Sequence, residues 1–296
     1  PMFKILIIFT TGLSVFASSL YGAWPMKPVK VIVPFKAGGT SDQTARVFQA
    51  SIKENNLLSK PITIVNVGGH YSIGSRQVME ASPDGYTFLL IHIALMGGEG
   101  SGALNFGWRD FEPVAGSGEF CLFPMVRKDS GINSVGELLG LAKSKPDSLI
   151  FGANLGAINH LAGVMLQELE RGAKFRFVQI GGGTANYTAL TGAQTNTTVL
   201  SGAEVVKFTR LPDGSENPEA QIKPLAYTGP SRFKQLSHLP TMKELGYDME
   251  FCIKSWWFAP ILSFTTEEIF QIINKEKNSS IHLENFPNIP SKWKNE

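Results

Sequence analysis

The chain has 296 residues, of which 43% are hydrophobic, and its 27 basic and 25 acidic residues give a formal net charge of +2. A single hydrophobic core rarely grows beyond about 250–300 residues, so this length favours two medium domains over one large one. The basic residues are spread along the sequence, which excludes the concentrated positive charge that binds nucleic acid or an anionic membrane surface. We therefore expect two globular domains and no nucleic-acid partner.

The first 23 residues have the pattern of a signal peptide. Lys4 precedes an uncharged run at residues 5–20, and small residues continue to Ala23 before Trp24 and Pro25. The run is shorter than the roughly 20 apolar residues of a membrane-spanning helix, and its small-residue flank suits a signal peptidase. We predict cleavage after Ala23 and export of the remaining chain, with an uncleaved anchor as the alternative.

Export would place the two cysteines, Cys121 and Cys252, in an oxidising compartment. There they could form a disulfide, whereas the alternative is a pair of buried thiols. The sequence leaves both alternatives open.

Strands and helices alternate from residue 29 onward. The β-branched run at residues 29–35 predicts a strand, the turn Gly38-Gly39-Thr40-Ser41-Asp42 follows it, and residues 43–52 have helical spacing. The same order recurs with a strand at residues 62–67, a helix at 73–81 and a buried strand at 86–94.

The alternation continues in the second half of the chain. Ser134 and Glu137 form a capping box that predicts a helix at residues 135–143. Further strands are expected at 149–152, 175–180 and 225–228, and further helices at 160–171 and after Gly181. Strands joined by crossover helices predict an α/β fold with a mostly parallel, doubly wound sheet. Residues 211–218 read as a surface loop, and the tail from residue 274 has little core-forming content.

Three glycine-containing turns lie between a predicted strand and a predicted helix, at residues 38–40, 154–159 and 181–184. Glycine lets the backbone approach a ligand closely, and free N–H groups at a helix N-terminus favour an anion such as a carboxylate. In an open parallel sheet such turns gather at the carboxyl ends of the strands, where ligands bind. The absence of arginine and lysine from the three turns favours one bound carboxylate over a densely charged ligand such as citrate.

Enzyme motifs are absent from the sequence. It contains no P-loop, G-x-S-x-G elbow, H-E-x-x-H motif or paired-cysteine metal spacing. Residues 98–103 satisfy the dinucleotide pattern, but no helix is predicted to follow them. His160 is interpreted as a structural hydrogen-bonding residue, and Asp42, the best candidate acid, as a helix cap. We expect no catalytic residue, no metal and no cofactor.

Several blocks of the sequence together resemble the substrate-binding receptors of tripartite tricarboxylate transporters, the Bug or TctC family of bacterial periplasmic proteins. The amino-terminal block is Trp24-Pro25-Met26-Lys27-Pro28-Val29, then Val31-Ile32-Val33-Pro34-Phe35, the Gly38–Asp42 turn and Ala45-Arg46. Further similar blocks follow in the expected order: Ser82-Pro83-Asp84-Gly85-Tyr86-Thr87, Asp110-Phe111-Glu112-Pro113-Val114, Ser134-Val135-Gly136-Glu137-Leu138, His160-Leu161-Ala162, Leu239-Pro240-Thr241 and Glu244-Leu245-Gly246-Tyr247.

The resemblance implies a two-lobed periplasmic binding protein of type II that closes on its ligand by hinge motion. It implies a discontinuous domain I at residues 24–124 and 228–296 and a domain II at 125–227. The implied function is to bind a small carboxylate in the interlobe cleft and deliver it to the membrane permease subunits of the transporter. The ligand classes include dicarboxylates, tricarboxylates, acidic amino acids and aromatic acids. We expect a periplasmic monomer that is not an enzyme.

Family ligand contacts map onto loop amides and small hydroxyl groups of this chain. The implied ligand-binding residues are Gly38, Gly39, Thr40, Asp42, Tyr71, Ser72, Ala153, Asn154, Gly156, Ala157, Asn159, Gly182, Gly183 and Thr184.

The sequence departs from the family pattern at several places. Ile180-Gly181-Gly182 stands where relatives commonly have Tyr-Lys-Gly, and Asn154 and Asn159 stand where small residues are usual. Residues 200–219 are longer than usual, and the likeness fades after Pro260. The alternatives are a binding protein that serves a sensor kinase, a decayed paralogue, and an enzyme on the same fold.

Overall fold

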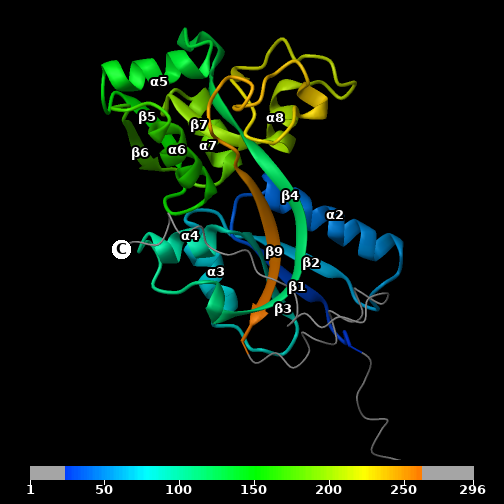
Figure 1. The fold of residues 1–296 in the computed structure, drawn as a ribbon. Helices are drawn as coiled ribbons and strands as arrows, with labels where there is room; N and C mark the ends of the chain where they lie inside the picture. The colour runs from blue at the N-terminus through cyan, green and yellow to red at the C-terminus, as the bar shows by residue number, and fades with distance from the viewer. Residues whose placement is uncertain (1–23, 262–296) are drawn as a thin grey trace, which may run out of the picture.

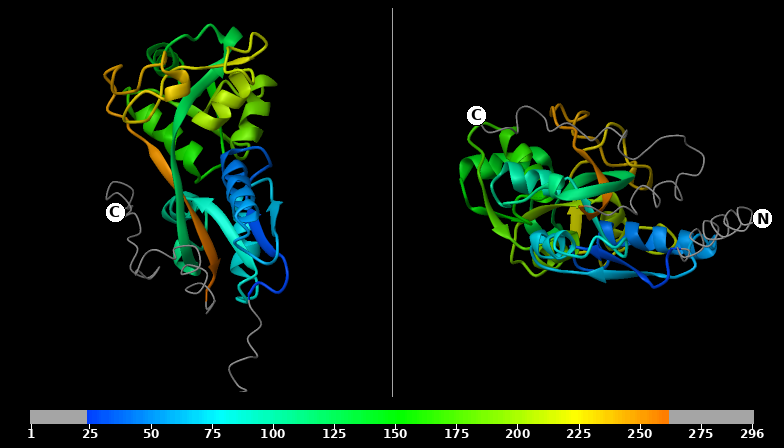
Figure 2. Two further views of the ribbon diagram at one scale, coloured as in Figure 1. Left: turned by 90° about the vertical axis from the view of Figure 1, so that its right-hand side faces the viewer. Right: turned by 90° about the horizontal axis from the view of Figure 1, so that it is seen from below.

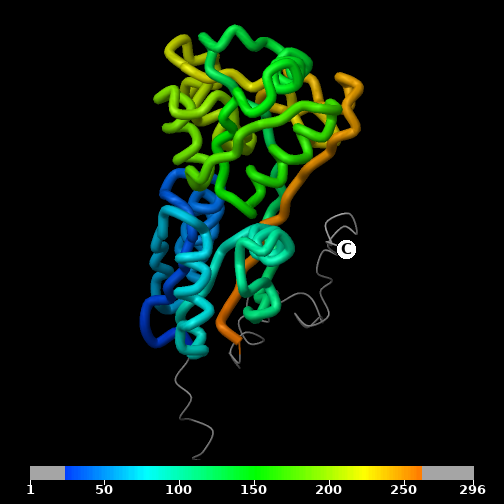
Figure 3. The backbone as a smooth tube through the Cα atoms, turned by 90° about the vertical axis from the view of Figure 1, so that its left-hand side faces the viewer, coloured from blue at the N-terminus to red at the C-terminus, as the bar shows by residue number. Residues whose placement is uncertain are grey.

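The computed structural model describes residues 24–261, which form two lobes joined by two long strands (Figure 1). Within these residues a sheet runs through both lobes in the order β2-β1-β3-β9-β4-β7-β5-β6, and β8 pairs with β4. The tube in Figure 3 shows the amino-terminal segments in one lobe and the middle of the chain in the other, with the orange strand returning between them. The predicted signal peptide and the polar tail from residue 274 lie outside the described residues.

The first lobe contains three parallel strands, with β1 between β2 and β3. The β-branched residues Val31, Ile32 and Val33 of β1 are almost fully buried, because the lobe's helices and strands pack around them. The elements of this lobe are β1 (Val29–Val33), α2 (Thr40–Glu54), β2 (Ile62–Asn66), α3 (Tyr71–Met79), β3 (Thr87–His92) and α4 (Ala94–Gly100).

The second lobe repeats the arrangement, with β5 paired in parallel to both β6 and β7. Ser134 caps α5 as predicted, since its Oγ accepts a hydrogen bond of 3.1 Å from Glu137 N. The predicted capping box also requires the Glu137 carboxylate to accept from Ser134 N. It accepts instead from Asn133 N, so the box forms only in part. The elements are α5 (Val135–Ser144), β5 (Leu149–Ala153), α6 (Ile158–Glu168), β6 (Phe175–Gln179), α7 (Gly183–Thr191), β7 (Thr197–Ser201), α8 (Gly202–Thr209) and β8 (Ile222–Pro224).

Two antiparallel strands, β4 (Phe111–Arg127) and β9 (Cys252–Pro260), run between the lobes (Figure 2). Strand β4 pairs with β9 along its first part and with β7 and β8 along its last part. Cys121 and Cys252 are directly opposite each other in this pairing, with Cα atoms 4.1 Å apart, and form a disulfide. The sequence analysis left open whether the two cysteines form a disulfide. It predicted parallel strands and did not predict the antiparallel pairing of β4 with β9.

The segment at residues 229–251 packs on the second lobe. Met242, Met249 and Phe251 are buried in the same core as Leu122 and Leu225 of that lobe. The expected domain boundary at residue 228 would assign these side chains to the first domain. We propose instead that the chain crosses between the lobes after Cys121 and again before Cys252.

The dinucleotide-like pattern at residues 98–103 is not a phosphate-binding loop. Helix α4 extends through Gly98 to Gly100, and a side chain at Gly98 would collide with Tyr71 and Leu104. Gly98 is therefore required for close packing. No helix in residues 24–261 is long and apolar enough to cross a membrane.

Removing the disulfide should lower the stability of the protein. A cross-link between residues 131 positions apart restricts the unfolded chain, so Cys121→Ala with Cys252→Ala should lower the free energy of unfolding by about 2–4 kcal/mol. Urea unfolding of residues 24–296, followed by circular dichroism, measures the change. Reductant should bring the wild type to the midpoint of the double variant and leave the variant unchanged, whereas equal midpoints under oxidising conditions would contradict the prediction.

Candidate functional site

A cavity of about 40 Å³ lies between the lobes. Its lining comes from the β1–α2 turn and the end of β3 in the first lobe, the crossing strand β4, and the starts of α6, α7 and α8 with β7 in the second lobe. The lining residues are Phe35, Lys36, Gly39, Thr40, Ser41, His92, Phe120, Leu122, Asn154, Ala157, Ile158, Asn159, Gly182, Gly183, Thr184, Val199, Ser201 and Glu204.

Three helices begin at this cavity without a side-chain cap. Gly39, Ala157 and Gly182 are the N-caps of α2, α6 and α7, and none of them supplies a capping hydrogen bond. By contrast, α5 and α8 begin at capping serines, Ser134 and Ser201. The first N–H groups of an uncapped helix need other acceptors, and the helix dipole favours an anion there. The cavity is therefore surrounded by backbone groups suited to a carboxylate.

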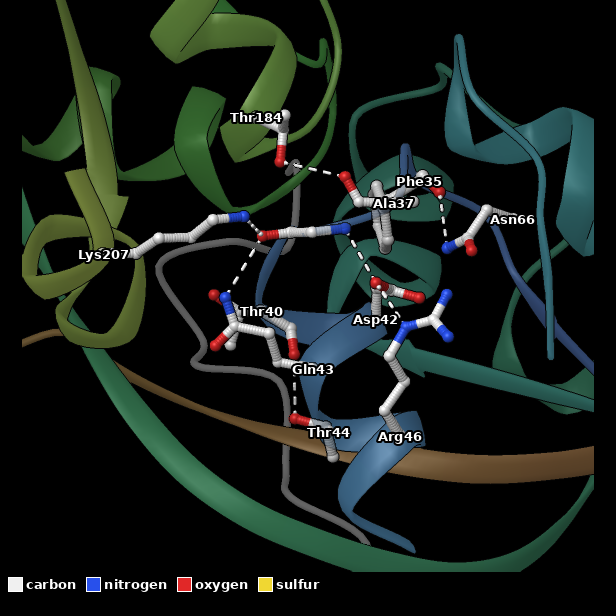
Figure 4. Close-up of polar contacts among 11 residues, drawn as sticks. Phe35, Ala37, Thr40, Asp42, Gln43, Thr44, Arg46, Asn66, Thr184 and Lys207 are labelled. Atoms are coloured by element: carbon white, nitrogen blue, oxygen red, sulfur yellow. Dashed lines mark hydrogen bonds and ion pairs between the residues drawn. The ribbon is translucent and has the colours of Figure 1, made fainter. Parts of the chain in front are cut away.

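Hydrogen bonds hold the two lobes together beside the cavity. Lys207 Nζ donates to Gly38 O at 3.1 Å, and Thr184 Oγ1 donates to Ala37 O at 3.5 Å (Figure 4). The hydroxyl groups of Thr40 and Ser201 also form a hydrogen bond across the cleft. These contacts join residues of the β1–α2 region to helices α7 and α8, so the structure represents a closed arrangement of the lobes.

Asp42 supports the first turn but does not line the cavity. It lies inside α2, which begins at Thr40, so it is not the N-cap that the sequence suggested. Its Oδ2 accepts hydrogen bonds from Gly38 N at 2.7 Å and from Arg46 Nε at 3.0 Å (Figure 4). Burial acts to raise the pKa of Asp42, but the hydrogen bonds from Arg46 and Gly38 outweigh it and hold the pKa below its ordinary value. The carboxylate thus fixes the shape of the glycine turn.

The turn before α6 is held by two buried asparagines. Asn159 Oδ1 accepts from Asn154 N at 2.9 Å, and Asn159 Nδ2 donates to Gly181 O at 3.1 Å. Asn154 Nδ2 donates across the lobes to Gly69 O at 3.4 Å. Both asparagine side chains thus bond to backbone groups outside this turn, those of Gly69 and Gly181. His160 is structural as predicted, since its Nδ1 accepts from the N–H of Gly156.

Eight of the fourteen residues predicted from the sequence line the cavity and six do not. Tyr71 is fully buried and lies next to Gly98 and Gly156, and Ser72 Oγ bonds to His70 Nδ1. The residues that line the cavity are Gly39, Thr40, Asn154, Ala157, Asn159, Gly182, Gly183 and Thr184; those that do not are Gly38, Asp42, Tyr71, Ser72, Ala153 and Gly156.

His92 at the end of β3 is a cavity residue that sequence reasoning missed. Its side chain is buried, its ring stacks on Phe35 at 5.0 Å, and its Nδ1 accepts a hydrogen bond from Ala94 N at 3.3 Å. That bond leaves the proton on Nε2, which has no partner among residues 24–261. Burial lowers the pKa of His92 to about 3, so the ring is neutral at neutral pH. His92 therefore offers one uncharged N–H donor at the cavity.

Two other parts of the cavity lining, an apolar wall and a buried carboxylate, were also not predicted from the sequence. Phe120, Leu122 and Val199 form an apolar wall supplied by the crossing strand β4 and by β7. Glu204 in the first turn of α8 supplies a buried carboxylate. The Ser-x-x-Glu pattern at residues 201–204 could have identified the cap of α8 from the sequence. No local pattern indicates that residues of β4 and β7 lie in a cleft.

Comparisons with known sequences point to one receptor family over most of the chain. A family model described as "Tripartite tricarboxylate transporter family receptor" matches residues 44–292. Protein BugT of Bordetella pertussis is 25% identical over 286 residues, which cover 93% of this chain and 82% of BugT. A UPF0065 protein of Agrobacterium vitis is 28% identical over 264 residues, which cover 85% of this chain and 70% of that protein. A stretch of 40 residues, 14% of the chain, is 65% identical to isoleucine–tRNA ligase of Pelagibacter ubique but covers 4% of that enzyme.

Solved structures share the fold. The periplasmic binding protein BugD matches with a TM-score of 0.74 and 27% identity, over 85% of this chain and 82% of that one. A Rhodopseudomonas palustris protein solved with adipate matches with a TM-score of 0.72 and 27% identity, over 85% and 82% of the two chains. MatC of the same organism, solved with malate, has a TM-score of 0.74 at 24% identity and covers 85% and 83% of the chains, which supports the fold alone.

Two lobes that meet over a cavity lined by helix N-termini are the features of a two-lobed solute-binding protein. The chain belongs to the tripartite tricarboxylate transporter receptor family, the Bug or TctC receptors. The fold expected from the resemblance is confirmed.

Replacing Asp42 should destabilise the protein in a pH-dependent way. Asp42→Asn should lower the free energy of unfolding by about 1–2 kcal/mol at pH 7, because Gly38 N and Arg46 lose a charged acceptor. The folded pKa of Asp42 lies below 3.8, so its stabilisation is present above that pH and is lost as the pH falls through the folded pKa.

Urea unfolding of both proteins at a series of pH values measures this effect. The difference should be constant above about pH 5 and shrink below the unfolded pKa. Arg46→Gln, which keeps the Gly38 hydrogen bond, should cost less because Arg46 is largely exposed. A difference that grows on acidification would contradict the prediction.

Proposed function

We propose that this protein is an extracytoplasmic receptor that binds a small carboxylate between its lobes and delivers it to a tripartite tricarboxylate transporter. The observation that carries the proposal is the convergence of three uncapped helix N-termini on one cavity. A carboxylate would accept hydrogen bonds from the first N–H groups of α6 and α7, whereas Thr40 N at the start of α2 already donates to Glu204 Oε1 at 3.3 Å. The adipate bound by the R. palustris relative is a carboxylate, which supports this ligand class.

The charges at the cavity favour a ligand with one bound carboxylate. Lys36, which is exposed, and Glu204, which is buried, are the charged side chains of the lining, and His92 is neutral. A tricarboxylate such as citrate would meet one basic group and one acidic group. The single N–H donor of His92 and the helix N-termini suffice for one carboxylate.

Catalysis is not part of the proposal. Two of the hydroxyl groups in the lining, those of Thr40 and Ser201, bond to each other, and Asp42, the best candidate acid, is paired with Arg46 outside the lining. Within residues 24–261 no group of three or more His, Cys, Asp or Glu side chains is placed to hold a metal ion. We propose a monomeric periplasmic receptor whose partners are the ligand and the permease subunits. A sensor kinase remains the alternative recipient of the occupied receptor.

A thermal-shift screen tests the ligand class. The protein comprising residues 24–296 is melted with a panel of small carboxylates and with matched uncharged amides. A ligand present at about 100 times its Kd should add about 2.7 kcal/mol of stability, which raises Tm by several degrees. A rise with a carboxylate and none with its amide supports the proposal, and a cooperative melt that responds to no carboxylate contradicts it.

His92 should contribute a hydrogen bond to the bound carboxylate. His92→Phe keeps an aromatic ring against Phe35 but removes the Nε2–H, so it should weaken binding by about 1.5–3 kcal/mol, or roughly 10- to 150-fold in Kd. Titration calorimetry with the best ligand of the screen measures the loss. His92→Gln restores an N–H donor and should recover part of the affinity; unchanged affinity in His92→Phe would exclude this role.

A further inference from the structure

Glu204 differs from an ordinary capping glutamate. Two helices of the second lobe begin with the pattern Ser-x-x-Glu: α5 with Ser134 and Glu137, and α8 with Ser201 and Glu204. In both, the N–H of the glutamate donates to the serine Oγ, at 3.1 Å and 3.3 Å. Glu137 is exposed, whereas Glu204 is only 4% exposed and lines the cavity. A capping role alone requires no burial, because the capping partners lie on the helix itself.

The two carboxylate oxygens of Glu204 have different surroundings. Oε2 completes the cap by accepting from Ser201 N and from Ser201 Oγ, each at 3.0 Å. Oε1 faces the cleft, where it accepts a long hydrogen bond of 3.3 Å from Thr40 N of the other lobe. A Cβ atom on Gly39 would lie 3.2 Å from Oε1, and one on Gly183 would overlap it. Oε1 thus lies between two of the glycine turns and keeps capacity to accept a further hydrogen bond.

A buried carboxylate at this place has an electrostatic consequence. No lysine, arginine or histidine forms an ion pair with Glu204 among residues 24–261. It would repel a second carboxylate of a ligand and attract an ammonium group. Burial raises the pKa of Glu204, and a cation beside it would offset the cost of ionising it in the closed cleft.

The remainder of the cavity completes a three-part arrangement. The uncapped starts of α6 and α7 and the N–H of His92 suit a carboxylate, and Glu204 suits a cation. Phe120, Leu122 and Val199 offer an apolar surface to the rest of the ligand. A carboxylate, an ammonium group and an apolar side chain are the three groups of a neutral α-amino acid.

We propose that Glu204 is an ammonium-binding residue and that the site takes a small zwitterionic amino acid with an apolar side chain. This inference rests on the proposed function, because it specifies the class of carboxylate that the receptor binds. Glu204 then selects against the 2-hydroxy acid and the simple acid of the same shape, which carry no ammonium group.

The test compares matched ligands on matched variants. Titration calorimetry at pH 7.5 uses L-alanine, L-valine and L-leucine, the corresponding 2-hydroxy acids, and the corresponding acids without a 2-substituent. The proteins are the wild type, Glu204→Gln and Glu137→Gln, each over residues 24–296. Both variants change one Ser-x-x-Glu cap to its amide, so Glu137→Gln controls for loss of the cap away from the cavity.

In the wild type, at least one amino acid should bind about 30-fold or more tightly than its unsubstituted acid, the size expected for a buried charge pair. Glu204→Gln should reduce that preference to within about threefold, because it weakens the binding of the amino acid and leaves the binding of the unsubstituted acid unchanged. Glu137→Gln should preserve the preference. Wild-type binding of plain acids as tightly as amino acids would overturn the inference and leave the proposed function intact. A preference that survives in Glu204→Gln would also overturn it. Binding of no carboxylate of any kind by the folded wild type would overturn the proposed function and the inference together.

Discussion

The antiparallel pairing of β4 with β9 determines how the rest of the molecule is arranged. The chain enters the second lobe along β4 and returns along β9, and the disulfide between Cys121 and Cys252 joins the strands where both cross. The parallel strands of each lobe end toward the cleft, so the helix starts of both lobes meet there. Phe120 and Leu122 flank the cysteine on β4 and form part of the cavity wall, which ties the crossing directly to the site.

The cavity lining contains two groups of opposite electrostatic preference. Uncapped helix starts favour an anion, and the protein leaves them without side-chain caps at α2, α6 and α7. Closure also brings Glu204 against Thr40 N, which places a protein carboxylate at one of those helix starts. Contacts such as Lys207 to Gly38 bring the lobes together with little buried charge, because that lysine is exposed.

Local patterns in the sequence predicted the fold well where they involved neighbouring residues. The strand of residues 29–33, the Ser134 cap and the glycine turns were all identified, because β-branched runs, capping residues and glycine have local physical effects. Eight of the fourteen candidate residues, which the family resemblance implied, line the cavity. His92, Phe120 and Glu204 were missed because their place in the cleft depends on strand order and lobe closure. Tyr71 was placed in the site by the family resemblance, but its hydroxyl group lies next to Gly98 and Gly156, which the sequence could not show to be neighbours.

The position of the disulfide also affects how the protein withstands proteolysis. Residues 121–252 form a closed covalent ring, because the disulfide joins Cys121 to Cys252. A protease that cleaves once in an exposed loop of this ring, such as residues 211–216, leaves both fragments covalently attached to the first lobe. In an oxidising compartment rich in proteases, a nicked receptor would therefore keep its two lobes as one molecule.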